Sequence, residues 1–306
     1  MNNQQYQDLA SEITQIEDIL KDLPQERWLE RISFENRLKS LKEELSKIDK
    51  NIIRHKAVIT FRGSPVFGTH GILVDFASKA SGALNDAVTS IAASLSENLR
   101  YKGPIPNRDK NKLLITNIAK GSFGFELEVP NSGENSLLPE ETNASIALEK
   151  MIELFNNSIA DNEEELSEIV QEIHPRAVKK VVDFLETLKT NNAWFAFEYK
   201  NKKAKYPNIE YIEKTISILD EKNIQENEET FLGEFQGVLP QSRTFEFKTN
   251  DNKLIKGKIS SDIKDPKVLN EEYLLIPVKI TLKTTQVGQS SPKYMLMDIE
   301  NIRIEN

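Results

Sequence analysis

Hydrophobic residues recur at alternating steps of three and four over residues 3–52, which is the spacing of a coiled-coil seam. Pro24 divides this pattern and suits the first turn of a second helix, where a missing N–H is tolerated. We therefore predict an antiparallel helical hairpin over residues 1–54. The seam of its second half consists of Phe34, Leu38, Leu41, Leu45, Ile48 and Ile52.

Two such helices do not bury both seams completely by themselves. The hairpin is therefore expected either to lie on the rest of the chain or to pair with a second copy of the protein. In the second case Leu38, Leu41 and Leu45 would carry the contact, and the protein would be a homo-oligomer.

Residues 55–221 have the element order of an α+β domain in which helices cover one face of a sheet. A long amphipathic helix is predicted because apolar residues at spacings of three and four form one stripe, and Gly103 and Pro104 follow it. The elements expected around it are a strand from Lys56, a glycine-containing hairpin loop at 62–71, the helix over 77–99, and strands at 72–76, 112–118 and 122–129.

The second half of this domain is predicted to be mainly helical. Pro175 suits the first position of a helix that follows His174, which is expected to cap that helix or to lie on the surface. The almost wholly polar segment 220–229 is predicted to be a linker. The other expected elements are helices at 140–158, 162–173, 175–190 and 209–219, a strand at 193–199 and a basic loop at 201–208.

Residues 229–306 show a different pattern, in which short segments alternate between apolar and polar positions. Three strands, a helix at 265–272 and two further strands have the element order of the oligonucleotide-binding (OB) barrel. SH3-like and other small barrels give a similar order, so a small β-barrel domain is the prediction. The expected strands are 229–239, 243–249, 253–260, 273–283 and 293–304.

Composition adds a few exclusions. The chain has 306 residues, which is typical of about two domains, and 38% of them are hydrophobic. Zero cysteines exclude disulfides, thiolate zinc sites and a cysteine nucleophile. No segment is apolar enough to span a membrane and the N-terminus lacks a leader signature, so we expect a cytoplasmic protein without a membrane partner.

The net charge of −8 is unfavourable for nucleic acid, but residues 229–306 hold 11 acidic and 11 basic residues. On an OB barrel the second and third strands form the face on which single strands lie. Nucleic-acid contact is therefore one hypothesis, protein docking another, and a solvated polar surface a third. Phe245 and Phe247 alternate with charged residues and are expected to face the core. The basic residues in question are Arg243, Lys248, Lys253, Lys256 and Lys258.

Two glycines within the expected strand near residue 122 indicate a bulge or a close neighbour. A packed bulge is one interpretation, and a partner-binding edge is the other. The residues of that candidate edge are Gly121, Phe123, Gly124 and Phe125.

Two Glu-x-Lys pairs, Glu198 with Lys200 and Glu246 with Lys248, resemble the second half of a metal-dependent nuclease site. Neither pair has an obvious acidic partner on a preceding strand. No nucleophile elbow is present and the three histidines lack sequence-level partners, so no catalytic residue, metal site or cofactor is predicted.

These patterns favour a non-enzymatic binding or assembly component, of the kind that could serve a bacterial regulatory or defence system. Its expected partner is another protein or a second copy of itself. Nucleic-acid binding through the C-terminal barrel is the first alternative and a metal-dependent nuclease is the second.

Overall fold

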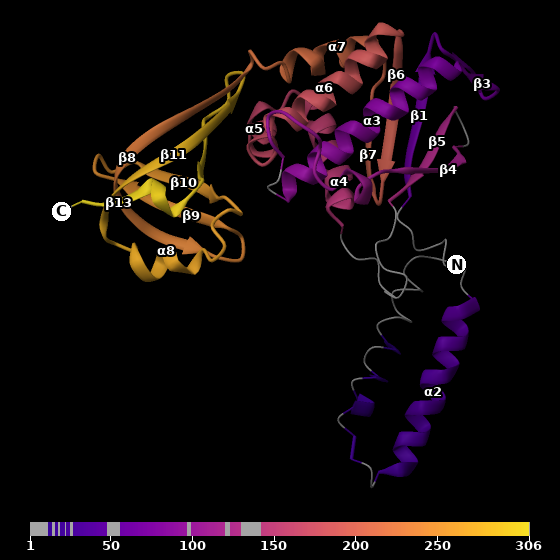
Figure 1. Ribbon diagram of the computed structural model, residues 1–306, viewed down its shortest axis with the longest axis horizontal. Coiled ribbons are helices and arrows are strands. Elements are labelled where there is room, and N and C mark those ends of the chain that lie inside the picture. Colours follow the sequence, from indigo (N-terminus) through magenta and orange to yellow (C-terminus); the bar gives the residue numbers. More distant parts are fainter. Residues whose placement is uncertain are drawn as a thin grey trace.

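The computed structural model describes residues 27–47, 56–96, 99–119, 123–129 and 142–305, together with 12–13, 16–17, 19–21 and 23–24. Within this part the chain mixes helices and strands, with an α/β unit in the middle of the sequence and a closed five-stranded barrel near the C-terminus (Figure 1). The α+β class predicted from the sequence is therefore confirmed. No helix among these residues combines the length and the apolar character that a membrane span requires.

The α/β unit is built on one antiparallel sheet with the strand order β4-β5-β1-β6-β7. In β1 and β6 every second side chain is buried, because one face of the sheet packs against helices. Phe61 and Phe195 belong to this buried set. The strands are β1 (Ala57–Gly63), β4 (Leu114–Ile118), β5 (Gly124–Glu128), β6 (Ala193–Tyr199) and β7 (Lys202–Lys205).

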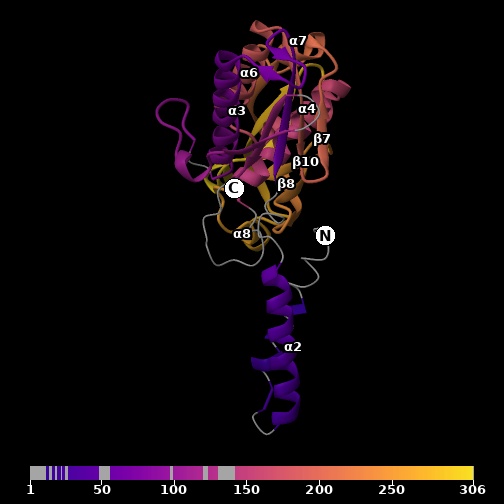
Figure 2. The same cartoon turned by 90° about the vertical axis from the view of Figure 1, so that its right-hand side faces the viewer.

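The helices of this unit gather on one side of the sheet (Figures 1 and 2). Helix α3 packs against α4 and α6, and α4 also contacts β6 and β7. The helices predicted near residues 140, 162, 175 and 209 are all present. Their bounds are α3 (Val74–Leu95), α4 (Asn143–Ala160), α5 (Glu163–Gln171), α6 (Pro175–Thr190) and α7 (Ile209–Ile218).

The prediction of a strand at 72–76 is wrong, because α3 already begins at Val74. Phe76 is almost completely buried and is the first residue of the apolar stripe of the helix. Helical geometry places this stripe against the core, which favours helix over strand here. Asp75 lies in the first turn, where a negative charge is favourable. Only a short hairpin of β2 (Val66–Phe67) and β3 (Gly71–Ile72) precedes the helix, and it is the hairpin predicted for the glycine-containing loop.

His174 caps α6, as one of the sequence interpretations proposed. Its Nδ1 accepts a hydrogen bond from the backbone N–H of Arg176 at 3.1 Å, and Pro175 occupies the first position of the helix. The backbone N–H of His174 donates to Oγ of Ser94 at 2.7 Å. The start of α6 is therefore tied to the C-terminal end of α3.

Two segments predicted as loops are strands. The basic segment 201–208 contains β7, an edge strand that pairs with β6. The polar segment 220–229, predicted to be a linker, includes the first six residues of β8 (Ile224–Leu239). These residues form strand because each has a partner on β11 (Pro277–Val287), from Ile224 opposite Val287 to Glu229 opposite Leu282.

The barrel closes through five strands in the order β8-β9-β10-β12-β11, and β11 pairs with β8 again. The pairing of β10 with β12 is parallel, and the other pairings in the ring are antiparallel. The last predicted strand, 293–304, is interrupted at Ile299–Asn301 and forms two strands. The remaining elements are β9 (Thr244–Thr249), β10 (Leu254–Ile259), α8 (Lys267–Glu272), β12 (Lys293–Leu296) and β13 (Ile302–Ile304).

Inside the barrel, Phe235 packs edge-to-face against both Phe245 and Phe247, at ring-centroid distances of 5.7 and 5.2 Å. Both of these phenylalanines are buried, so the prediction that they face the core is confirmed. Their polar neighbours Glu246 and Lys248 consequently point outward from β9.

The barrel and the α/β unit are joined by the end of β11 and by the β11–β12 loop (residues 288–292). Val287 is fully buried in the hydrophobic core of the α/β unit. Its backbone N–H donates to Oγ of Ser167 at 2.9 Å, and the hydroxyls of Ser167 and Ser290 lie 2.6 Å apart. Figure 1 shows the long β8–β11 ribbon reaching from the barrel toward the helices.

The loop also meets the acidic first turn of α5. The backbone N–H of Gln289 donates to the Glu163 carboxylate at 2.9 Å, and that of Ser291 donates to Glu164 at 2.7 Å. Lys293 then forms ion pairs with Glu164 at 3.0 Å and with Glu168 at 3.1 Å. A helix and a loop more than 120 residues apart in the chain are thus held together by hydrogen bonds and charge.

In the N-terminal region the described residues contain α2 (Trp28–Lys47). Leu41 is buried against Ile13 and Ile16, in a cluster separate from the other two hydrophobic cores. Ion pairs join α2 to the preceding segment, from Arg37 to Glu12 at 2.8 Å and from Lys42 to Glu17 at 2.7 Å. Much of the predicted hairpin, including the side chain of Leu45, lies outside the described residues.

Replacing Gly288 with alanine tests the junction. Gly288 has φ of 57°, and a Cβ there would lie 2.3 Å from Oε1 of Glu163. The left-handed backbone costs about 1 kcal/mol for alanine, and displacing Glu163 from Gln289 costs about another 1 kcal/mol. We expect a loss of about 2 kcal/mol in the free energy of unfolding, measured by urea denaturation.

Gly68→Ala is the matched control, because Gly68 has the same φ of 57° and no atom within 4 Å of its Cβ position. It should lose only the backbone contribution of about 1 kcal/mol. Equal losses in the two variants would contradict the contact between the loop and α5.

Candidate binding groove on the barrel

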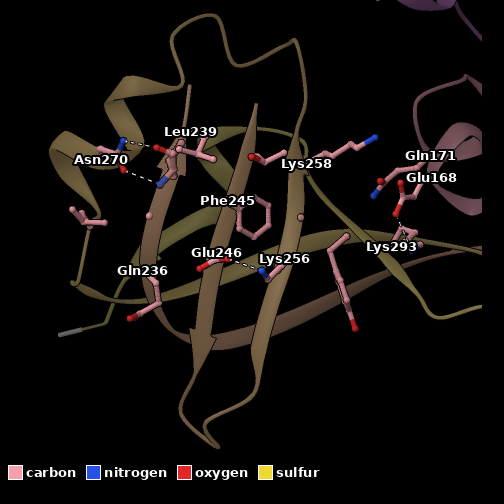
Figure 3. Close-up of a pocket in the computed structure, with 16 residues that line it drawn as sticks. Glu168, Gln171, Gln236, Leu239, Phe245, Glu246, Lys256, Lys258, Asn270 and Lys293 are labelled. Carbon is pink, nitrogen blue, oxygen red and sulfur yellow. Dashed lines mark hydrogen bonds and ion pairs between the residues drawn. The ribbon is translucent and has the colours of Figure 1, made fainter. Parts of the chain in front are cut away.

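A groove of about 940 Å³ runs over the outer surface of β8, β9 and β10 (Figure 3). Helix α5 bounds one end of this barrel groove through Glu168 and Gln171. The segment containing α8 bounds the other end through Asn270 and Leu274. Docking of the barrel against the α/β unit therefore supplies one end of the groove.

The floor of the barrel groove is mainly apolar. Leu239 is 66% exposed and Leu274 is 37% exposed at the surface. Phe245 lies beneath the floor, and its ring occupies the space above Gly257, where a Cβ would come within 2.4 Å of a ring carbon. Glycine at 257 thus lets the aromatic ring come close to the backbone of β10.

Asn270 fixes the wall formed by β8. Its side-chain amide donates to the carbonyl of Val238 at 2.9 Å and accepts from the N–H of Val238 at 3.0 Å. These bonds occupy the backbone of β8 just beyond the bulge between Phe235 and Gly237. Both polar ends of the Asn270 amide are consequently occupied in this wall.

The three lysines that line the barrel groove are each paired with a carboxylate. Lys256 lies 2.8 Å from Glu246 on the neighbouring strand. Lys293 contacts Glu168, as described above. Lys258 contacts Glu172, which follows α5 and also contacts Lys150 of α4. The positive charges of the three groove lysines are therefore neutralised by neighbouring carboxylates of the same chain.

The Glu172 carboxylate links the barrel to two helices. Burial alone would raise its pKa, but the ion pairs with Lys150 and Lys258 outweigh that effect and lower the pKa below the ordinary value of 4.5. The ionised form is thus favoured by folding. This carboxylate holds the α5 end of the barrel groove together at neutral pH.

Gln171 supplies an unused hydrogen-bond donor at this end of the groove. Its side chain is only 8% exposed, and Nε2 has no hydrogen-bond partner within the part of the chain that the structure describes. Gln171 and Lys258 also line an adjoining cleft of about 610 Å³, which includes Tyr101, His174 and Arg243. A buried amide without a partner is unfavourable unless a ligand or water satisfies it.

The structure separates the five basic residues that the sequence grouped together. Lys256 and Lys258 line the barrel groove, whereas Lys248 and Lys253 do not. Lys253 instead lies 5.8 Å from the centre of the Tyr294 ring. The guanidinium of Arg243 donates to the backbone carbonyls of Ile259, Ser260 and Ile263, so its role is structural.

Sequence reasoning missed Glu168, Gln171 and Lys293. Glu168 and Gln171 belong to α5, more than 50 residues from the barrel strands in the chain. Only the docking of the barrel brings them to the groove, and no local pattern in the sequence indicates that docking. Gln171 on the amphipathic helix α5 could have been flagged only as one polar residue among many.

Two residues of the candidate partner-binding edge, Gly124 and Phe125, do not lie at an edge of the sheet. Gly124 and Phe125 belong to β5, which lies between β4 and β1. Gly124 is required because a Cβ there would lie 2.0 Å from the carbonyl oxygen of Ile59. Phe123 and Phe125 pack edge-to-face at 6.3 Å, and Gly121 lies outside the described residues.

The Glu-x-Lys pairs do not form a common site. Glu198 contacts Lys203, whereas Lys200 lies beyond the end of β6 with φ of 52° and contacts Glu149. Glu246 is paired with Lys256. Throughout the described ranges, no three His, Cys, Asp or Glu side chains come together as a potential metal site.

Comparison with known proteins yields no matching family model, no similar curated protein and no similar solved structure. The barrel groove must therefore be interpreted from its own geometry. Its features are an apolar floor, balanced charges at the rim and one unpaired amide donor.

Glu172→Gln tests the link between barrel and helices. At neutral pH the variant should lower the free energy of unfolding by about 2 kcal/mol, because two lysines lose a partly buried partner. Because the folded-state pKa of Glu172 is depressed, its contribution is complete above about pH 4.5 and is lost as the pH falls through the folded-state pKa. Urea denaturation at neutral pH and near pH 3 should show the difference from wild type shrinking in acid.

Glu165→Gln is the matched control, since Glu165 is an exposed carboxylate on α5, the helix that Glu172 follows. It should change the free energy of unfolding by only a few tenths of a kcal/mol. A Glu172→Gln effect that stays constant with pH would contradict the assigned role of the carboxylate.

Proposed function

We propose that this protein is a non-enzymatic binding component that holds an extended polypeptide segment of another protein in the barrel groove. The observation that carries the proposal is the pairing of every groove lysine with a carboxylate above an apolar floor. Such a surface favours a ligand that binds through apolar side chains and backbone hydrogen bonds over a ligand that carries charges of one sign.

The same features are unfavourable for nucleic acid. Single strands bind where cations are free to contact phosphates and where aromatic rings are exposed for base stacking. Here the half-buried Lys258 would first have to leave Glu172, and Glu246 places a negative charge beside the exposed Lys256. Phe245 and Phe247 are buried inside the barrel, so neither is available to stack on a base.

We also propose that the barrel is of the OB type. Supporting this, helix α8 lies between the third and fourth barrel strands in chain order, β10 and β11. The groove then lies over the first three strands, and the second and third of these form the usual ligand face of that barrel. In this proposal the usual ligand face of an OB barrel binds a polypeptide, because its lysines are already paired with carboxylates.

Selection of peptides from a random displayed library against the full chain tests the proposal. Peptides that bind should lose affinity about tenfold in Leu239→Lys, because a charge then enters the apolar floor. Affinities can be measured by fluorescence anisotropy with labelled peptides.

Lys248→Ala is the control, because Lys248 is exposed on β9 but does not line the barrel groove. Its affinity should equal that of the wild type. Selected peptides that bind all variants equally would place their site elsewhere and contradict the proposal.

We propose in addition that the N-terminal region mediates self-association. Supporting this, Trp28 is 60% exposed and Ile32 is 47% exposed on α2, while Leu38 is only partly buried against Ile13, Ile16 and Leu41. These apolar positions favour a second copy over solvent.

Light scattering coupled to gel filtration tests the self-association. The full chain should have the mass of a dimer or larger, and Ile32→Lys should shift it toward monomer because Ile32 is exposed in the single chain. Lys39→Ala, on the same helix, should leave the mass unchanged. A monomeric wild-type chain over the concentrations tested would contradict this part of the proposal.

A further inference from the structure

The two edges of the five-stranded sheet differ in chemistry. Strand β7 at one edge has the sequence KKAK, and its Lys202 and Lys203 form ion pairs with Glu153 and Glu198. Charged lysines on an edge strand discourage pairing with another chain. Strand β4 at the other edge has the sequence LITNI and carries no charge.

Strand β4 is exposed at all five positions. Leu114 is 47% exposed, and Ile115 and Ile118 are each 55% exposed. Backbone pairing along this strand is restricted at its C-terminal end, where the N–H of Ile118 donates to the side chain of Asn117 at 2.9 Å. A bulge between Ile115 and Asn117 further limits a regular pairing to the first part of the strand.

A basic segment precedes the part of β4 that remains free. Arg108 is paired with Asp86, and Lys112 is paired with the exposed Asp109. Lys110 is exposed, and its side chain forms no ion pair or hydrogen bond with the described residues. Exposed pairs contribute little to stability, so Lys112 can exchange Asp109 for another carboxylate.

From these observations we propose that β4 receives an added strand from another protein, whose uncharged apolar residues lie beside Leu114 and Ile115 and whose acidic residues lie beside Lys110 and Lys112. Strand addition supplies main-chain hydrogen bonds, and the flanking charges fix the register. A second copy is a poorer occupant, because β4 has no acidic residue to place beside the lysines.

This surface is independent of the barrel groove. In Figure 1, β4 lies at the side of the α/β unit away from the barrel. The proposal explains why one edge of the sheet is guarded by lysines and the other is apolar. It also moves the partner-binding role that the sequence suggested for β5 to the neighbouring strand β4.

The test uses the full chain and a fluorescein-labelled peptide of alternating valine and threonine that ends in three aspartates. The peptide should bind saturably in an anisotropy titration. Ile115→Lys should weaken binding about tenfold, because a charge then lies on the apolar edge. Replacing both Lys110 and Lys112 with glutamate should weaken it by a similar factor, and a peptide ending in three lysines should bind as weakly.

Two control variants separate this site from others. Lys205→Glu on the opposite edge and Leu239→Lys in the barrel groove should bind the aspartate peptide like the wild type. Because Ile115 is exposed, its replacement should leave the circular dichroism spectrum unchanged, and the milder Ile115→Ser should show a smaller loss of binding in the same direction.

Absence of saturable binding to the wild type would overturn the proposal. Equal binding by wild type and Ile115→Lys would also overturn it, as would loss of binding in Leu239→Lys. Concentration-dependent self-association that Ile115→Lys abolishes would assign the edge to a second copy and would likewise overturn the proposed occupant.

Discussion

The insertion of the end of β11 into the helical layer is the contact on which the candidate site depends. Val287 is buried in the core of the α/β unit, and the hydroxyl of Ser167 holds the backbone of β11 at the point of entry. Since a buried apolar residue and a buried hydrogen bond act together, the barrel has a defined orientation on α5. Without this contact the barrel groove would lose the boundary formed by Glu168 and Gln171.

At this junction, lysines of the barrel groove form ion pairs with carboxylates of the helical unit and are therefore not free to contact a ligand. Lys258 is paired with Glu172 and Lys293 with Glu164 and Glu168, all from α5 or the residue after it. The acidic first turn of α5 also accepts backbone N–H groups from the β11–β12 loop. The consequence is a groove whose net charge is small and whose free surface is apolar, which is the basis for proposing a polypeptide ligand.

The sequence was sufficient for the elements whose periodicity is strong. The stripe of α3, the proline at the start of α6 and the alternation in β6 and β9 all predicted the observed structure. The errors occurred where tertiary pairing overrides local composition. Residues 224–229 are polar, yet each finds a partner on β11, and the basic segment with Lys202 finds one on β6.

The candidate site was only partly predictable, for the same physical reason. Lys256 and Lys258 could be placed on adjacent positions of a barrel face from their alternation. Their carboxylate partners could not be foreseen together, because Glu246 lies on the next strand while Glu172 comes from a helix in another part of the chain. The partner-binding edge was assigned to β5 because the sequence does not reveal that β4 pairs outside it.

The most direct test of the account is the binding of a labelled single-stranded oligonucleotide of about 20 nucleotides to the full chain at low salt, about 50 mM. If the groove lysines are held by Glu246, Glu172 and Glu168, the account predicts no saturable binding even under this favourable condition. Saturable binding that weakens steeply as salt is added, and that Lys256→Glu abolishes, would contradict the assignment of the barrel groove to a polypeptide.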